Sequence, residues 1–237
     1  MRSEVMAINP ENMISLATPA DFSGIRQIWE EQFPLDPTET EYYNTVFENL
    51  IPLCTNYICK KEGKIISTTS FMPIVFINEH EQITLNGQYL FGVATKEEFK
   101  GQGLASELIK KASCEFRIKD TDFIIERPAN QNLNNFYIKL GFTISIKKQK
   151  YTFTCTDSIH LTDTAIISQI RNNFKTRFEW ANKDILKSLI MLGEVQRHNE
   201  QQTAELFSQK TYIALNILGK SISPDLFTNA FFCFTLE

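Results

Sequence analysis

Glycine is scarce in this chain, at 9 of 237 residues, or about 4 % against a usual share of about 7 %. Little of the backbone is therefore flexible filler, and we expect each glycine to serve a local need. Five of the nine lie between positions 87 and 141, as Gly87, Gly92, Gly101, Gly103 and Gly141. This clustering directs attention to the middle of the chain.

Other features are missing, and their absence excludes several classes of protein. The sequence contains no run of about 18 apolar residues, so we expect no membrane-spanning helix. The 24 basic residues are outnumbered by 28 acidic residues, which argues against a nucleic-acid partner. Residues 1–12 lack the apolar segment of a signal peptide and are interpreted as an N-terminal tail.

Cysteine and histidine offer little for disulfides or metal binding. The five cysteines are odd in number and lack CxxC spacing, at Cys54, Cys59, Cys114, Cys155 and Cys233. Reduced thiols in a cytoplasmic protein fit this pattern best. The three histidines are far apart, at His80, His160 and His198, so we expect no metal site.

The apolar periodicity predicts a mixed α/β domain over residues 13–155. Strands are predicted at 13–17, 57–59, 64–68, 71–77, 83–85, 89–95, 122–126 and 142–146, and helices at 19–33, 38–50, 104–112 and 130–140. Hairpin turns are predicted at Glu62-Gly63 and Asn86-Gly87. The segment 89–95 is almost entirely apolar, so we expect a central strand buried on both faces.

Residues 156–237 are interpreted as a small C-terminal α/β extension or a second small domain. Helices are predicted from Thr162 or Asp163 to Phe174 and from Asn182 or Lys183 to Val195, and strands at 178–180, 211–218 and 231–236. The pattern leaves open whether these strands extend the first sheet.

The segment 93–106 combines a buried strand, a short polar loop, two glycines separated by one residue, and a helix. Gly101 and Gly103 allow a tight turn and the close approach of a ligand to the backbone. The first amides of the following helix suit phosphate oxygens, and Lys100 adds positive charge. This is not a Walker loop, because no Gly-Lys-Ser/Thr follows. Ser106 stands where a Rossmann fingerprint needs its third glycine.

A second motif lies downstream, with Asn130, then Tyr137 after six intervening residues, then Gly141-Phe142. Together with the loop Lys100-Gly101-Gln102-Gly103-Leu104-Ala105, it resembles the GNAT superfamily of acyl-CoA-dependent N-acetyltransferases. The family's loop reads Arg/Gln-x-x-Gly-x-Gly/Ala, so Lys100 keeps a charge but loses the bidentate fork of arginine. The resemblance implies a mixed, mostly antiparallel central sheet flanked by helices.

The resemblance also implies acetyl-CoA as the acyl donor, without a metal. By the family's pattern, backbone groups of Val93, Ala94 and Thr95 bind the pantetheine arm. The pyrophosphate is held by the loop Lys100, Gly101, Gln102, Gly103, Leu104, Ala105 and Ser106. Asn130 corresponds to the family's cofactor-side asparagine, although it suits a helix N-cap equally well.

Tyr137 resembles the family's general acid, which protonates the leaving CoA thiolate. A phenol with a pKa of ~10 is protonated at neutral pH and lies near the ~8.5 of a thiol. A packed aromatic side chain is the alternative. The general base is less clearly marked. Glu126 is the first candidate, against a solvated strand end, and the α-carboxylate of Glu237 is the second; Glu98 is interpreted as a surface charge of the loop.

The acceptor is predicted to be a primary amine bound near the first pair of helices. The acidic and aromatic residues there, Phe33, Asp36, Glu39, Glu41, Tyr42 and Tyr43, suit a cationic amine, although an ordinary amphipathic helix with an acidic first turn explains them equally. The competing function is a non-catalytic acyl-CoA-binding module whose residues 156–237 recognise a partner. A longer acyl donor, admitted or excluded by Phe91 or Phe136, and a homodimer both stay open.

Overall fold

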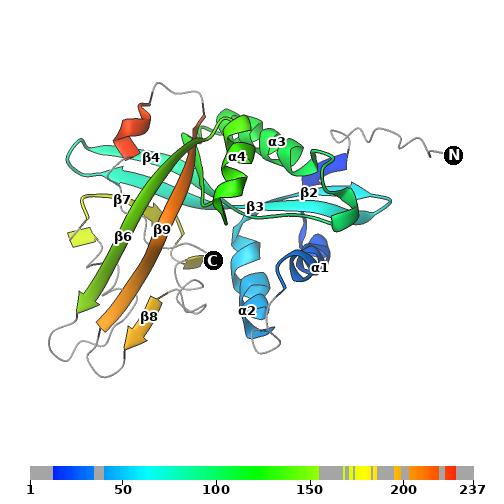
Figure 1. Ribbon diagram of the computed structural model, residues 1–237, viewed down its shortest axis with the longest axis horizontal. Helices are drawn as coiled ribbons and strands as arrows, with labels where there is room; N and C mark the ends of the chain where they lie inside the picture. The colour runs from blue at the N-terminus through cyan, green and yellow to red at the C-terminus, as the bar shows by residue number, and fades with distance from the viewer. Residues whose placement is uncertain are drawn as a thin grey trace.

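The protein is built on one large sheet (Figure 1). A computed structural model describes residues 13–34, 40–154, 168, 171–172, 174–182, 184–185, 195–198, 203–218 and 222–227. The strands in these residues are β1 (Ile14–Leu16), β2 (Thr55–Lys61), β3 (Lys64–Asn78), β4 (Ile83–Thr95), β5 (Phe123–Glu126), β6 (Thr143–Thr154), β7 (Thr176–Trp180), β8 (Val195–His198) and β9 (Thr203–Ile217). Seven of them follow the order β1-β2-β3-β4-β5-β9-β6, while β7 pairs with β3 and β8 with β9. The β4–β5 pair is parallel and the other pairs are antiparallel, which confirms the predicted mixed sheet.

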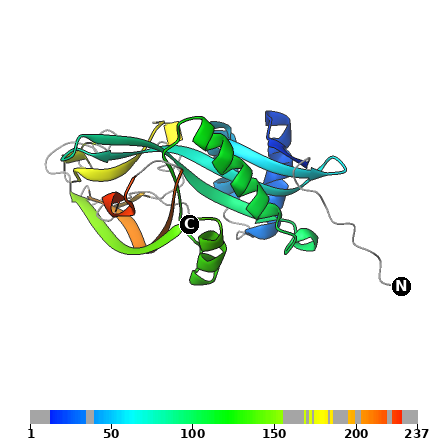
Figure 2. The ribbon, with the colours of Figure 1, turned by 90° about the horizontal axis from the view of Figure 1, so that it is seen from above.

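Helices cover both faces of the sheet (Figures 1 and 2). They are α1 (Phe22–Gln32), α2 (Thr40–Thr45), α3 (Leu104–Ile118) and α4 (Asn134–Lys139), with a π turn, η4 (Val46–Leu50), directly after α2. Apolar residues of α1, α2 and η4 form one core with one face of β3 and β4. Those of α3 and α4 form a second core on the opposite face. No helix in the described part of the chain is long and apolar enough to cross a membrane.

The start of α1 follows the capping signal in the sequence. The Thr18 backbone amide and hydroxyl each donate to Asp21 Oδ2 at 2.9 Å, and Pro19 begins a short 3-10 turn that leads into the helix. This is the pairing expected of a capping box. Below α1, Tyr43 of α2 reaches the carbonyl oxygens of Trp29 and Phe33 with its hydroxyl, which ties the two helices together.

The predicted hairpin turn at Asn86-Gly87 is wrong, whereas the one at Gly63 is confirmed. Asn86 and Gly87 lie inside β4, where they pair with Val75 and Ile74 of β3. The chain turns earlier, at residues 79–82. Gly87 is needed for packing, because a Cβ there would lie 2.2 Å from the Phe123 ring. The predicted strands 64–68 and 71–77 are accordingly one continuous strand, β3.

The C-terminal third contributes strands to the same sheet. β9 lies between β5 and β6, and β7 runs along the far half of β3. The β6–β9 ladder curves away from the plane of β3 and β4 (Figure 2). The predicted strands at 178–180 and 211–218 are confirmed as parts of β7 and β9, but Val195 begins strand β8 and does not end a helix. The predicted strand 231–236 and most of the predicted helix 162–174 lie outside the described residues.

Candidate active site

The site is built where β4 and β5 separate. The two strands pair in parallel from Gly87 opposite Phe123 to Leu90 opposite Glu126, where β5 ends. β4 continues through Thr95, and among the described strands its partner there is β3. The β5-facing backbone groups of residues 93–95 are therefore left without a strand partner in the described fold. Unpaired strand groups of this kind can bind an extended ligand by adding hydrogen bonds at the edge.

β4 contains a bulge close to the point where it separates from β5. Thr68 pairs with Ala94 and Ser70 with Phe91, so Gly92 and Val93 together face Thr69. Gly92 has φ +59°, and a Cβ there would lie 1.9 Å from Trp29 Cζ2. Only glycine permits both this backbone conformation and the close packing of the indole from α1. The Val93 side chain packs partly buried against the α3 core, which leaves its backbone for any ligand contact.

The predicted phosphate loop joins β4 to α3 and is open to solvent. Gly101 and Gly103 have φ +76° and +79°, and a Cβ added to either meets no atom within 4 Å. Gly103 is the N-cap of α3, which begins without a capping side chain. The first amides of this 15-residue helix are thus free to bind an anion. Lys100 pairs with Glu97 at 2.6 Å on the surface.

Tyr137 and Glu126 form a buried pair at the separation of the strands. Glu126 is 5 % exposed and Tyr137 is 4 % exposed. They are joined by a side-chain hydrogen bond, in which the Tyr137 hydroxyl donates to the carboxylate. Glu126 Oε2 is buried without a partner in the described structure. The hypothesis of a solvated strand end at Glu126 is therefore wrong.

Burial controls the protonation of this pair. Desolvation raises the pKa of Glu126 to about 8, although the Tyr137 hydrogen bond and the charge of Arg127 oppose this rise. Desolvation and the neighbouring Glu126 charge raise the pKa of Tyr137 well above its ordinary value, so its hydroxyl stays protonated. A carboxyl group that titrates near neutral pH beside a protonated phenol can both accept and supply protons.

The other predicted residues fall into different places. Asn130 caps the short turn before α4, where its side chain accepts from the Asn132 amide at 3.0 Å, and it is exposed. Glu98 is exposed on the loop, as expected of a surface charge. Glu237 lies outside the described residues, as do Asp36 and Glu39. Within the described part, no three His, Cys, Asp or Glu side chains gather as a metal site would require.

A cavity of about 260 Å³ connects the Tyr137–Glu126 pair to the helices on the other side of β4. Strand β4 contributes Tyr89, Leu90, Phe91, Gly92 and Val93 to its lining, and the end of β5 with the segment after it contributes Glu126, Arg127 and Ala129. Tyr137 of α4 and Leu133 of the 3-10 turn before it line the same side, and Trp29, the α1 C-cap Phe33, Tyr42 and Tyr43 line the side of α1 and α2. The sequence pattern did not indicate that Trp29, Tyr89, Arg127 and Leu133 line the site. Trp29 fits the apolar periodicity of its helix, so the sequence marks it as an ordinary core residue. The one hint was Gly92, a glycine inside an otherwise apolar strand, against which the Trp29 ring packs.

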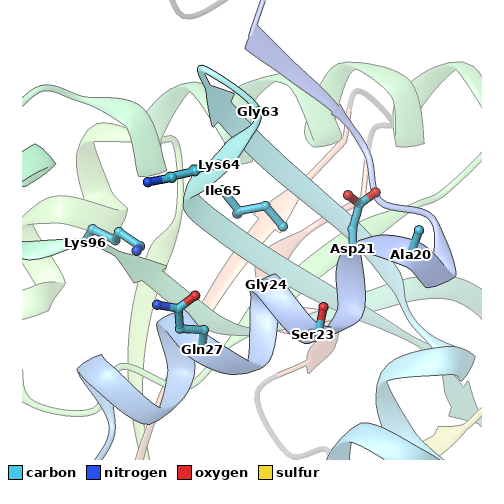
Figure 3. Close-up of a pocket in the computed structure, with 9 residues that line it drawn as sticks. All are labelled: Ala20, Asp21, Ser23, Gly24, Gln27, Gly63, Lys64, Ile65 and Lys96. Atoms are coloured by element: carbon cyan, nitrogen blue, oxygen red, sulfur yellow. The ribbon is translucent and has the colours of Figure 1, made fainter.

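A larger groove of about 400 Å³ lies between α1, the β2–β3 turn and the end of β4 (Figure 3). Its lining is polar, and Figure 3 shows Lys96 and Gln27 reaching toward one another across it. Two of its three charged lining residues are already paired, because Asp21 lies 2.5 Å from Lys60 and Lys96 lies 3.7 Å from Glu31. None of the predicted site residues that the structure describes lines this groove. The smaller cavity is therefore the candidate active site.

Comparison with known proteins agrees with this geometry. The family profile of the acetyltransferase (GNAT) domain matches residues 13–145. Because this match covers more than half of the chain, the protein belongs to the GNAT acetyltransferases, a family of acyltransferase enzymes. No protein of curated function matches the sequence.

Solved structures share the fold at low sequence identity. A conserved protein of Enterococcus faecalis V583, described as a probable N-acyltransferase, has a TM-score of 0.58 and 12 % identity over 86 % of this chain and 72 % of its own. Eis1 from Mycobacterium abscessus has a TM-score of 0.56 and 8 % identity over 73 % and 46 %. A GCN5-related N-acetyltransferase from Kribbella flavida has a TM-score of 0.54 and 11 % identity over 76 % and 49 %. This chain thus spans about half the length of the last two proteins.

Proposed function

We propose that this protein transfers the acetyl group of acetyl-CoA to a primary amine by direct attack, with Tyr137 as the general acid and Glu126 as the general base. The observation that carries this proposal is the buried Tyr137–Glu126 pair beside the unpaired end of β4. The cavity next to the pair opens toward α1 and α2, on the side away from α3. Donor and acceptor can therefore reach the pair from opposite sides.

Acetyl-CoA would be held mainly by backbone groups. The pyrophosphate fits the open amides from Gly101 to Ser106, with Lys100 nearby, and the pantetheine arm fits the unpaired backbone of residues 93–95. The side chain of Asn130 already serves as a cap, so its contribution would come from the exposed turn that it shapes. We place the enzyme in the cytoplasm, where the free thiols of Cys54, Cys59 and Cys114 stay reduced.

The proton movements follow from the two pKa values. An amine of pKa ~10 arrives as an ammonium ion and gives one proton to the Glu126 carboxylate. Its nitrogen attacks the thioester carbonyl carbon, and a β4 amide stabilises the resulting oxyanion. The carbon–sulfur bond then breaks, Tyr137 protonates the thiolate, and Glu126 returns a proton to Tyr137 through their hydrogen bond. The second proton of the nitrogen leaves to water, so the products are an amide, free CoA and one released proton.

Release of free CoA thiol tests the proposal. The full chain is mixed with acetyl-CoA and a panel of amines, and acetylated products are identified by mass spectrometry. We expect amine-dependent thiol release well above the rate of acetyl-CoA hydrolysis. Tight CoA binding without turnover on any amine would instead support the non-catalytic binding module.

The phosphate loop provides a second test through Gly103. Replacing Gly103 with alanine places a side chain in the left-handed region, which costs roughly 1–2 kcal/mol. Because this conformation aims the α3 amides at the ligand, we expect the Kd of CoA in isothermal titration to rise about tenfold. Gly63→Ala is the matched control, since Gly63 has φ +78° and also has open space around its Cα. Equal CoA affinity in the two variants would contradict a role for the loop.

A further inference from the structure

We infer that the preferred acceptor is a small monoamine with an uncharged apolar body, selected by the aromatic cavity between β4 and the α1–α2 pair. This inference rests on the proposed function and names its substrate class. Seven of the residues that line the cavity are aromatic: Tyr137 of the buried pair, and the six that form the aromatic wall, namely Trp29, Phe33, Tyr42, Tyr43, Tyr89 and Phe91.

The aromatic wall is rigid around Trp29. Its ring meets those of Phe33, Phe47 and Phe91 edge to face, with centroids 5.7, 5.4 and 5.7 Å apart. The Tyr43 hydroxyl is anchored on the carbonyl groups at the end of α1. Fixed aromatic side chains bury an apolar body at little entropic cost.

Charge in the cavity favours one ammonium group and no more. Glu126 and Arg127 are its charged lining residues, and Glu126 Oε2 is a buried acceptor without a partner in the described structure. An ammonium ion beside Glu126 supplies the missing hydrogen bond. A second ammonium group on the same molecule would face Arg127 or the aromatic wall, where its desolvation is not repaid.

The volume of the cavity and the residues at its mouth further restrict the class of acceptor amine. The cavity of about 260 Å³ is below the 300–1,000 Å³ typical of sites for drug-sized ligands. Its mouth is apolar, since Phe33 and Leu133 line it while 40 % and 37 % exposed. A short alkylamine or arylalkylamine fits both features, whereas a folded protein substrate could offer only a single extended side chain.

The inference is tested with acceptors of similar length. The full chain is assayed with acetyl-CoA and one of three amines. Phenethylamine is the expected substrate, putrescine carries a second ammonium group, and phenylalanine carries an added carboxylate. We expect kcat/KM for phenethylamine to exceed that for each of the others at least tenfold. Preference for putrescine or phenylalanine would overturn the inference but leave the acetyltransferase intact. If no amine is acetylated, the proposed function fails. Binding is then measured by Trp29 fluorescence in a Trp180→Phe variant. If phenethylamine does not quench this fluorescence, or quenches it no more than putrescine and phenylalanine do, the inference is overturned as well.

A substitution at the rim should shift the preference. Phe33→Glu adds a carboxylate at the mouth, which can pair with the far ammonium group of putrescine. We expect the ratio of kcat/KM for putrescine to that for phenethylamine to rise about tenfold. Leu16→Glu, on the edge strand β1, also replaces an exposed apolar side chain with a carboxylate, since Leu16 is 47 % exposed and Phe33 is 40 % exposed. This control variant should leave the ratio unchanged. An unchanged ratio in Phe33→Glu would show that the acceptor does not occupy this cavity.

Discussion

Replacing Tyr137 with phenylalanine is expected to lower kcat by about 100-fold or more, in the range typical of a lost general acid. The ring would keep its edge contacts with Phe136 and Phe142, which lie 5.0 and 5.6 Å away between centroids. The Kd of CoA should therefore stay within about twofold, since the proposed binding of the cofactor uses backbone groups elsewhere. Steady-state kinetics and calorimetry on the same preparation separate the two effects.

Tyr57→Phe is the matched control for this variant. Tyr57 is also buried, and its hydroxyl also donates to a carboxylate, Glu115 Oε2, at 2.7 Å. Its removal costs a comparable buried hydrogen bond but lies on the α3 side of β2, outside the cavity. A fall in kcat of equal size in both variants would mean that Tyr137 supports the fold and takes no part in the reaction.

The phosphate loop and the helix that carries Tyr137 could be predicted from sequence, because the residues that determine their backbone conformation lie close together in the chain. Gly101, Gly103 and Gly141 adopt positive φ values within a few residues of the helix ends that they define. The Gly87 turn failed for the opposite reason. Its Cβ is excluded by Phe123, a residue 36 positions away on a neighbouring strand, and no local pattern contains that contact.

The wall of the cavity also depends on contacts between residues far apart in the sequence, which a local pattern does not contain. Trp29 and Phe91 come from different elements and meet only because the bulge at Gly92 admits the indole. The sequence left Glu126 open between a general base and a solvated strand end, and only the fold shows that it is 5 % exposed and that desolvation raises its pKa. β9 was predicted as a strand over 211–218, but its place between β5 and β6 depends on pairs between residues that lie 49 (Thr154 and Thr203) to 94 (Phe123 and Ile217) positions apart. Long-range pairing of this kind leaves no mark in the local pattern of either strand.

The pH dependence of catalysis gives a direct test of Glu126. Below its pKa of about 8 the carboxyl group is protonated and cannot take a proton from the acceptor. We therefore expect kcat/KM to rise with pH up to about 8, and to fall again near the pKa of the amine itself, ~10. Glu126→Gln should remove the rising limb and lower the maximum about 100-fold, while Gln still offers an oxygen to the Tyr137 hydroxyl. Glu98→Gln, at an exposed carboxylate of the loop, should leave the profile unchanged.

Protein stability provides a readout of the same group that does not depend on activity. The folded state raises the pKa of Glu126 from 4.5 to about 8, so it binds a proton that the unfolded chain releases at lower pH. The stabilisation from the neutral carboxyl group is fully present below about pH 4.5 and is lost as the pH rises through about 8. Thermal unfolding of the wild type should therefore show a decline in Tm across this window that Glu126→Gln lacks. If both proteins decline in parallel, Glu126 titrates normally, and the rising limb of the activity profile belongs to another group.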